Sequence, residues 1–141
     1  MRNEWFQFCR SLAFPIEDLH EYLLKANDGV NVMAIQAIGK FILDNGGAFV
    51  ARGAVAYIEQ NGTRHLSATT GDILLGQHAM VDPAQLGVPD GSLILMYVVV
   101  VAGTDNEATQ SFTFQKESRV VAHYRINGTT KINTLSLISV N

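Results

Sequence analysis

The chain has 141 residues, with 10 Lys and Arg against 13 Asp and Glu, which gives a formal net charge of −3. This length fits one domain and leaves little room for two. Nucleic-acid binding normally needs a basic face that neutralises phosphates, and the few cationic residues here are scattered. We therefore expect no nucleic-acid partner.

The balance of apolar and charged residues bears on assembly. Apolar residues make up 48% of the sequence and charged residues only 16%, whereas a typical globular protein has about 25% charged residues. Such a composition fits a well-filled core or an apolar surface that a second subunit covers. We favour the second interpretation, and expect a homo-oligomer, because segments 48–58 and 93–102 are apolar on both faces when read as strands.

Residues 1–29 are predicted to form a short N-terminal helical segment in front of a β domain at 30–141. Apolar residues in 3–26 recur at three- and four-residue spacing, which is typical of an amphipathic helix. The large aromatic side chains of this segment need cover, either from the β domain or from a neighbouring subunit. The candidate interface residues are Trp5, Phe6 and Phe8.

The sequence does not predict a membrane span or a secretory signal. The longest apolar run, 93–102, has ten residues, whereas a membrane-spanning helix needs about 20. The N-terminus carries Glu4 and lacks the unbroken apolar stretch of a signal peptide. We expect no transmembrane segment, and a location in the cytoplasm or export without a classical signal peptide. A single cysteine, Cys9, rules out an intramolecular disulfide.

After residue 30 the pattern changes to short, apolar, often β-branched stretches separated by turn residues. Asn-Gly pairs at 45–46, 61–62 and 127–128 are expected to close hairpins. No segment there supplies the crossover helices of a parallel sheet. The prediction is mostly β, an antiparallel β-sandwich of Greek-key or jelly-roll-like topology with about eight strands. The expected strands are 32–43, 48–58, 63–70, 73–75, 93–102, 109–114, 120–126 and 132–140.

Residues 76–92 form the longest stretch with no expected strand. Connections longer than about 12–15 residues often carry function in compact domains. The stretch has hydrogen-bonding capacity suited to a carbohydrate, another small polar ligand or a partner protein, although a plain connection between sheets is the favoured explanation. The candidate ligand-binding residues are Gln77, His78, Asp82, Gln85 and Asp90.

Signals for catalysis and for metal binding are weak. The sequence has no Gly-x-Ser-x-Gly elbow, and its four histidines lie too far apart in sequence to form a local metal motif. The acidic loop residues do not show the spacing of a calcium loop. We expect no catalytic residues, no metal and no cofactor. An enzyme would require a deep pocket in which two or more of His65, His78, His123 and the loop acids converge.

Two short motifs, Gly47-Ala-Phe-Val-Ala51 and Gly128-Thr-Thr130, resemble stretches of small bacterial and fungal β-sandwich lectins and cytolysins. The resemblance implies a sandwich fold and a role in carbohydrate binding or membrane action, and it assigns no site residues. From the residues themselves we predict a non-enzymatic binding or self-assembly module that forms a homo-oligomer. The alternative is a carbohydrate-binding or membrane-acting sandwich protein of the lectin or cytolysin type.

Overall fold

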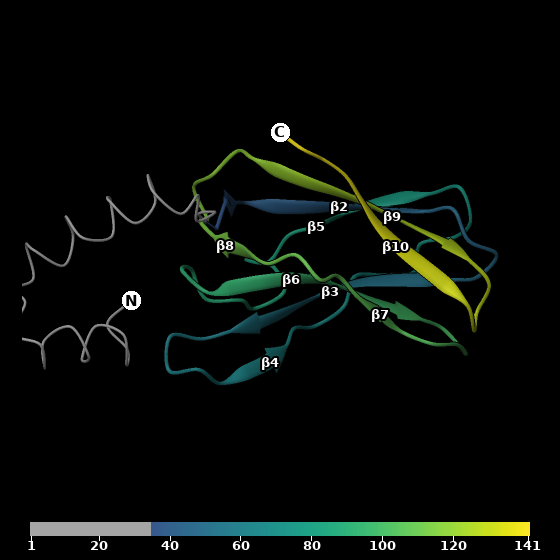
Figure 1. The fold of residues 1–141 in the computed structure, drawn as a ribbon, viewed down its shortest axis with the longest axis horizontal. Coiled ribbons are helices and arrows are strands. Elements are labelled where there is room, and N and C mark those ends of the chain that lie inside the picture. The colour runs from purple at the N-terminus through teal and green to yellow at the C-terminus, as the bar shows by residue number, and fades with distance from the viewer. Residues whose placement is uncertain (1–34) are drawn as a thin grey trace, which may run out of the picture. The chain divides into compact units, whose positions relative to one another are not determined.

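The computed structural model describes residues 35–141, which form one compact unit of two mixed β-sheets (Figure 1). The predicted helical segment 1–29, with Trp5, Phe6 and Phe8, lies outside the described residues. The helical segment, its boundary with the β domain at 29/30 and the proposed interface therefore stay predictions.

The larger sheet has the strand order β1-β8-β6-β3-β4, and β7 also pairs with β6. The smaller sheet has the order β10-β9-β2-β5. The larger sheet is made of β1 (Ala37–Ile38), β3 (Ala51–Ile58), β4 (Arg64–Leu66), β6 (Leu93–Val100), β7 (Asn106–Glu107) and β8 (Phe112–Phe114). The smaller sheet is made of β2 (Lys40–Asn45), β5 (His78–Val81), β9 (Val121–Gly128) and β10 (Asn133–Val140). Residues 35–141 include no helix of the length and apolarity that crossing a bilayer requires.

The two sheets share one hydrophobic core, as the period-two pattern of the strands requires. Alternate residues of β6 are buried, and the same holds for β2, where Phe41 and Leu43 are fully enclosed. Phe41 of the smaller sheet meets Phe112 of the larger sheet edge-on, with ring centroids 6.0 Å apart. Edge-to-face contact is a favoured arrangement of aromatic rings. Packing between the sheets therefore confirms the mostly β prediction and its two layers.

The prediction that all strands are antiparallel is wrong. β1 pairs in parallel with β8, and β2 pairs in parallel with β9. The sequence argument required a helix for each parallel connection. Here the chain between the paired strands runs through the opposite sheet, so strands take the place of the crossover helix. Gly39 separates β1 from β2 where the chain changes sheet, and a Cβ there would overlap the Ser118 carbonyl oxygen.

Two of the three predicted Asn-Gly hairpins are confirmed. Gly62 lies between β3 and β4 with a φ of 88°, and Gly128 is the last residue of β9, directly before the hairpin connection 129–132, with a φ of 116°. These positive φ values are the reason for glycine at both positions. The third hairpin is wrong, because β2 and β3 on either side of Asn45-Gly46 belong to different sheets.

Segment boundaries also differ from the prediction in the middle of the chain. The predicted strand 73–75 is reduced to a single bridge between Ile73 and Ala51. The stretch 76–92, predicted to have no strand, contains β5. β5 has only four residues and mixes exposed and buried positions, so its sequence lacks the alternation that marks a half-buried strand.

Tyr124 places a polar atom in the shared core. The residue is 2% exposed, and its hydroxyl has no hydrogen-bond partner among residues 35–141. Burial raises the pKa of the Tyr124 phenol from its ordinary value of 10.0 to about 12. The folded state therefore holds the neutral phenol at a pH where the unfolded chain ionises it. This contribution to stability is complete below pH 10 and is lost as the pH rises through about 12.

We predict that Tyr124→Phe leaves the free energy of unfolding at pH 7 unchanged or raises it by about 1 kcal/mol, because it removes an unpaired buried hydroxyl. At pH 11 the wild type should have lost about 1.4 kcal/mol more than the variant relative to pH 8, since only the wild type has the shifted phenol. Urea denaturation at the two pH values measures both effects. A variant that loses more than 1 kcal/mol at pH 7 would instead indicate that the hydroxyl has a partner.

Candidate functional site

Four connections meet at one end of the domain, the right-hand end in Figure 1. β2 and β9 run parallel and finish together, with Asn45 opposite Ile126. β3 begins where β6 ends, with Ala51 opposite Val100. Backbone hydrogen bonds tie the connections to each other, such as the 2.7 Å bond from the Thr104 amide to the Thr130 carbonyl. We call this region the loop end, and it comprises 46–50, 71–77, 101–105 and 128–132.

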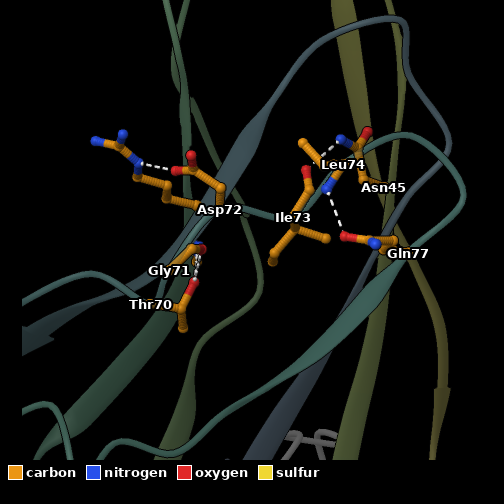
Figure 2. A network of polar contacts seen from close by, with 9 residues as sticks. Asn45, Thr70, Gly71, Asp72, Ile73, Leu74 and Gln77 are labelled. Atoms are coloured by element: carbon orange, nitrogen blue, oxygen red, sulfur yellow. Dashed lines mark hydrogen bonds and ion pairs between the residues drawn. The ribbon is translucent and has the colours of Figure 1, made fainter.

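Asn45 holds two of these connections in place from a buried position, with 1% of its surface exposed. Its Nδ2 donates to the carbonyl oxygens of Phe49 at 2.6 Å and Ile73 at 2.8 Å. Its Oδ1 accepts from the amide of Gly47 at 2.9 Å. Figure 2 shows this side chain beside Ile73, Leu74 and Gln77. The amide group thus supplies partners to the buried Gly47 amide and Phe49 carbonyl, and adds a second hydrogen bond to the Ile73 carbonyl, which also accepts from the Ala51 amide.

A tight turn follows at Leu74–Gln77. The Leu74 amide donates to Gln77 Oε1 at 3.1 Å, and the Gln77 amide donates back to the Leu74 carbonyl at 2.9 Å (Figure 2). Gly76 has a φ of 85° and donates its amide to the Asn45 carbonyl at 2.7 Å. Leu74 and Leu75 are 48% and 63% exposed on this turn. The hydrogen bonds of this turn therefore hold two adjacent leucines in positions exposed to solvent.

A further exposed aliphatic residue lies on the β9–β10 connection. Ile132 is 81% exposed, the highest value among the large hydrophobic residues of the described region. Hydrogen bonds within the loop hold the Ile132 backbone in place. The Ile132 amide donates to Thr129 Oγ1 at 3.1 Å, and the Ile132 carbonyl accepts from the Thr129 amide at 2.7 Å. Lys131 precedes it and is exposed. Leu74, Leu75 and Ile132 together are called the aliphatic tip.

The acidic side chains Asp72 and Asp105 near the tip are paired with other protein groups. Arg52 Nε lies 2.6 Å from Asp72 Oδ1. The Tyr97 hydroxyl donates to Asp105 Oδ2 at 3.0 Å, and burial together with that hydrogen bond raises the pKa of Tyr97. Asp105 Oδ1 accepts from the Val100 amide at 3.0 Å. These acids serve the local structure, so the loop end offers a ligand the exposed aliphatic side chains together with Lys131.

The five predicted ligand residues do not form one site. Gln77 lies at the loop end, where it braces the Leu74 turn. His78 begins β5, with its Nδ1 4.0 Å from Asp44 Oδ1. Asp82 and Asp90 lie toward the opposite end, since β5 runs antiparallel to β2 and places Val81 opposite Phe41. The set is therefore divided between the two ends of the domain.

At that opposite end the predicted acids accept hydrogen bonds from backbone amides. Asp82 Oδ1 accepts from Ala84 at 3.1 Å, in a turn that also leaves Gln85 exposed. Asp90 Oδ1 accepts from Lys116 at 2.7 Å. Asp90 also lines an open hollow of about 390 Å³ beside Phe114. Their role as ligand-binding residues stays a prediction.

The histidines of the described region are distributed over both sheets. His123 Nε2 lies 2.8 Å from Asp44 Oδ2 on the smaller sheet. His65 stands on β4 of the larger sheet, stacked on Tyr57 with ring centroids 5.1 Å apart. Within residues 35–141, no three His, Cys, Asp or Glu side chains are grouped so that they could hold a metal ion.

Sequence reasoning missed the aliphatic tip and the Asn45 anchor. The sequence pattern predicts a strand at Leu74 and Leu75, and the start of the last strand at Ile132. Gly76 directly after two leucines was the available signal, because a glycine with positive φ marks a turn and so places its neighbours at a surface.

Comparison with known proteins adds distant similarities. The sequence matches no protein-family model and no curated protein. The fold is similar to part of pneumolysin, with a TM-score of 0.40 and 15% identity over 71% of this chain and 23% of that one. For listeriolysin O the TM-score is 0.42, with 15% identity over 73% of this chain and 22% of the other. The membrane-binding domain of pneumolysin gives a TM-score of 0.34 and 12% identity, over 72% of this chain and 96% of that domain.

This chain therefore spans less than a quarter of the two whole toxins to which it is similar. At these TM-scores the similarities assign neither a family nor a function to the chain.

The Asn45 network generates a stability prediction. Asn45→Ala should lower the free energy of unfolding by about 2–4 kcal/mol, because it removes three hydrogen bonds and leaves buried backbone groups unpaired. Asn61→Ala is the matched control, since Asn61 Oδ1 accepts one hydrogen bond, from Thr63, in an exposed turn. The control should cost less than about 1 kcal/mol. Equal losses in urea denaturation would contradict the anchoring role of Asn45.

Proposed function

We propose that this domain is a non-enzymatic binding module that attaches to the surface of a lipid membrane through the aliphatic tip. The observation that carries the proposal is the exposure of Leu74, Leu75 and Ile132 on hydrogen-bonded turns of one end of the domain. Scattered exposed hydrophobic residues are common on proteins. Adjacent leucines on a braced turn, with an isoleucine at the same end, are a more specific arrangement.

The size of the apolar contact sets the expected strength of binding. Fully burying an aliphatic side chain is worth about 1.5–3 kcal/mol. These three side chains are already partly covered, so insertion would contribute about 3–5 kcal/mol in all. That is close to the marginal, reversible anchoring of a single myristoyl chain, about 10⁴ M⁻¹. Exposed Lys131 beside Ile132 would add about 1 kcal/mol on an anionic surface.

Rigidity supports binding by reducing its entropic cost. A flexible loop must be ordered when it binds, which opposes association. Both turns that carry the tip are already closed by hydrogen bonds from Gln77 and Thr129. The leucines are thus held outward before contact, and little ordering remains.

Carbohydrate binding is less well supported by this end of the domain. A sugar site needs several polar groups that converge on the ligand and are not already used. At the loop end, Asn45 and Gln77 hydrogen-bond to the backbone and Asp72 pairs with Arg52. The large exposed hydrophobic side chains that remain at this end are those of the aliphatic tip, which suit lipid acyl chains.

We predict that the double variant Leu74→Ser/Leu75→Ser binds phosphatidylcholine–phosphatidylserine vesicles at least tenfold more weakly than the wild type in co-sedimentation. Each substitution removes an aliphatic contact of about 1 kcal/mol or more. The matched control is Leu66→Ser/Met80→Ser, at 48% and 50% exposure on β4 and β5, away from the loop end. The control should stay within twofold of the wild type.

Vesicles of phosphatidylcholine alone should bind about five times more weakly than the mixed vesicles, because the contribution of Lys131 is lost. The proposal would be rejected by a wild-type chain that stays in the supernatant at millimolar lipid. Equal weakening by the tip variant and by the control would also reject it, since binding would then not depend on this end of the domain.

A further inference from the structure

β10 is unusual among the strands at the ends of the two sheet orders. β1, β4 and β5 have two, three and four residues, whereas β10 has eight. A sheet edge presents unpaired backbone amides and carbonyls that can accept another strand. Natural proteins limit this by keeping edge strands short. Of the four outermost strands, β1, β4 and β5 are therefore short, and β10 is the exception.

The sequence of β10 also lacks the side chains that protect an edge. Asn133–Val140 contains no charged residue, no proline and no glycine. A register irregularity between Leu137 and Ser139 is its one protective feature. It leaves Ile138 in solvent at 54% exposure. An uncharged eight-residue edge with an exposed isoleucine favours pairing with another strand.

Both ends of β10 are held by hydrogen bonds, and no strand of the described region pairs with its outer edge. Asn106 Nδ2 donates to Asn133 Oδ1 at 2.7 Å, and Asn133 Nδ2 donates to the Thr104 carbonyl at 2.9 Å. Within residues 35–141, β9 is the one strand that pairs with β10. The edge is therefore held in a defined position, which lowers the cost of ordering it on pairing.

We propose that β10 pairs antiparallel with β10 of a second copy of this chain, about a two-fold axis at Ser136. The two four-stranded sheets then continue into one another across the axis. In this register Leu135 of one copy faces Leu137 of the other, and Thr134 faces Ile138. Leu135 and Leu137 already pack against the core, so the pairing extends apolar contact from one core to the next.

A second copy is the occupant that the composition of β10 favours. A two-fold axis brings each residue of the strand near its own counterpart, so a charged strand would repel itself. β10 carries no charge and meets no such repulsion. The nearest fixed charge across the ladder is Arg125, opposite Ser136 on β9.

Ser136 is the position at which the proposal is tested. Wild-type full-length chain should show a concentration-dependent mass in light scattering that approaches twice its 15.4 kDa. Ser136→Lys places two cations face to face across the axis, and it should weaken the dimer at least tenfold. Met80→Lys, on the opposite edge of the same sheet, is the matched control and should leave the dimer unchanged.

A charge-swap mixture separates pairing at the axis from loss of folding. Ser136→Asp alone should also weaken the dimer, while an equimolar mixture of the Lys and Asp variants should regain a dimer at wild-type strength. If Ser136→Lys loses the β-sheet circular dichroism spectrum, Ser136→Asp beside Arg125 supplies the same like-charge test.

A wild-type mass of one chain up to 200 µM would overturn the proposal. So would equal weakening by Ser136→Lys and Met80→Lys, or a charge-swap mixture that fails to recover. Protection of the β10 amides from hydrogen exchange in a monomer would assign the edge to another segment of the same chain, and would equally overturn it. None of these readouts involves lipid, so they are independent of the membrane proposal.

Discussion

At the end of β2 the chain leaves one sheet for the other, and the backbone groups released there need partners inside the protein. The buried amide of Asn45 supplies them to Gly47, Phe49 and Ile73 at once. Its own backbone pairs with Gly76 and Gln77. Asn45 thus stabilises both the crossover between the sheets and the turn that carries the leucines. A folded loop end and an exposed tip are consequences of the same network.

The strands that could be predicted are those with a strong local pattern. β6, β9 and β10 alternate or run apolar for eight residues, and turn residues bound them, so sequence alone located them within about two residues. Strand direction could not be read in this way. Parallel pairing of β2 with β9 depends on where residues 46–120 travel, and that path is decided by packing between the sheets. The Asn45-Gly46 pair is typical of a hairpin turn. The strands on either side of it nevertheless belong to different sheets, because both pack their apolar side chains into the core between the sheets.

The candidate site was harder to predict than the fold, for a physical reason. Polar residues in 76–92 have the hydrogen-bonding groups to bind a ligand, yet Gln77, Asp82 and Asp90 accept hydrogen bonds from backbone amides of the domain. Amino-acid composition does not distinguish a polar side chain that hydrogen-bonds within a turn from one that is available to bind a ligand. For Leu74 and Leu75 the error runs the other way. Their apolar side chains predict burial, but the turn at Gly76 exposes them to solvent.

The two proposals constrain each other through strand direction. β10 begins at the loop end, directly after Ile132, and runs away from it. An antiparallel β10–β10 pair reverses that direction in the second copy, so the two aliphatic tips of a dimer point to opposite ends of the joined sheet. Such a dimer does not place both tips on one bilayer, and its affinity for a single surface gains nothing from bivalency. It presents one tip to each of two surfaces, which makes it a bridge between vesicles. The two proposals, weak single-tip binding and self-pairing, are therefore compatible, and together they predict adhesion between membranes.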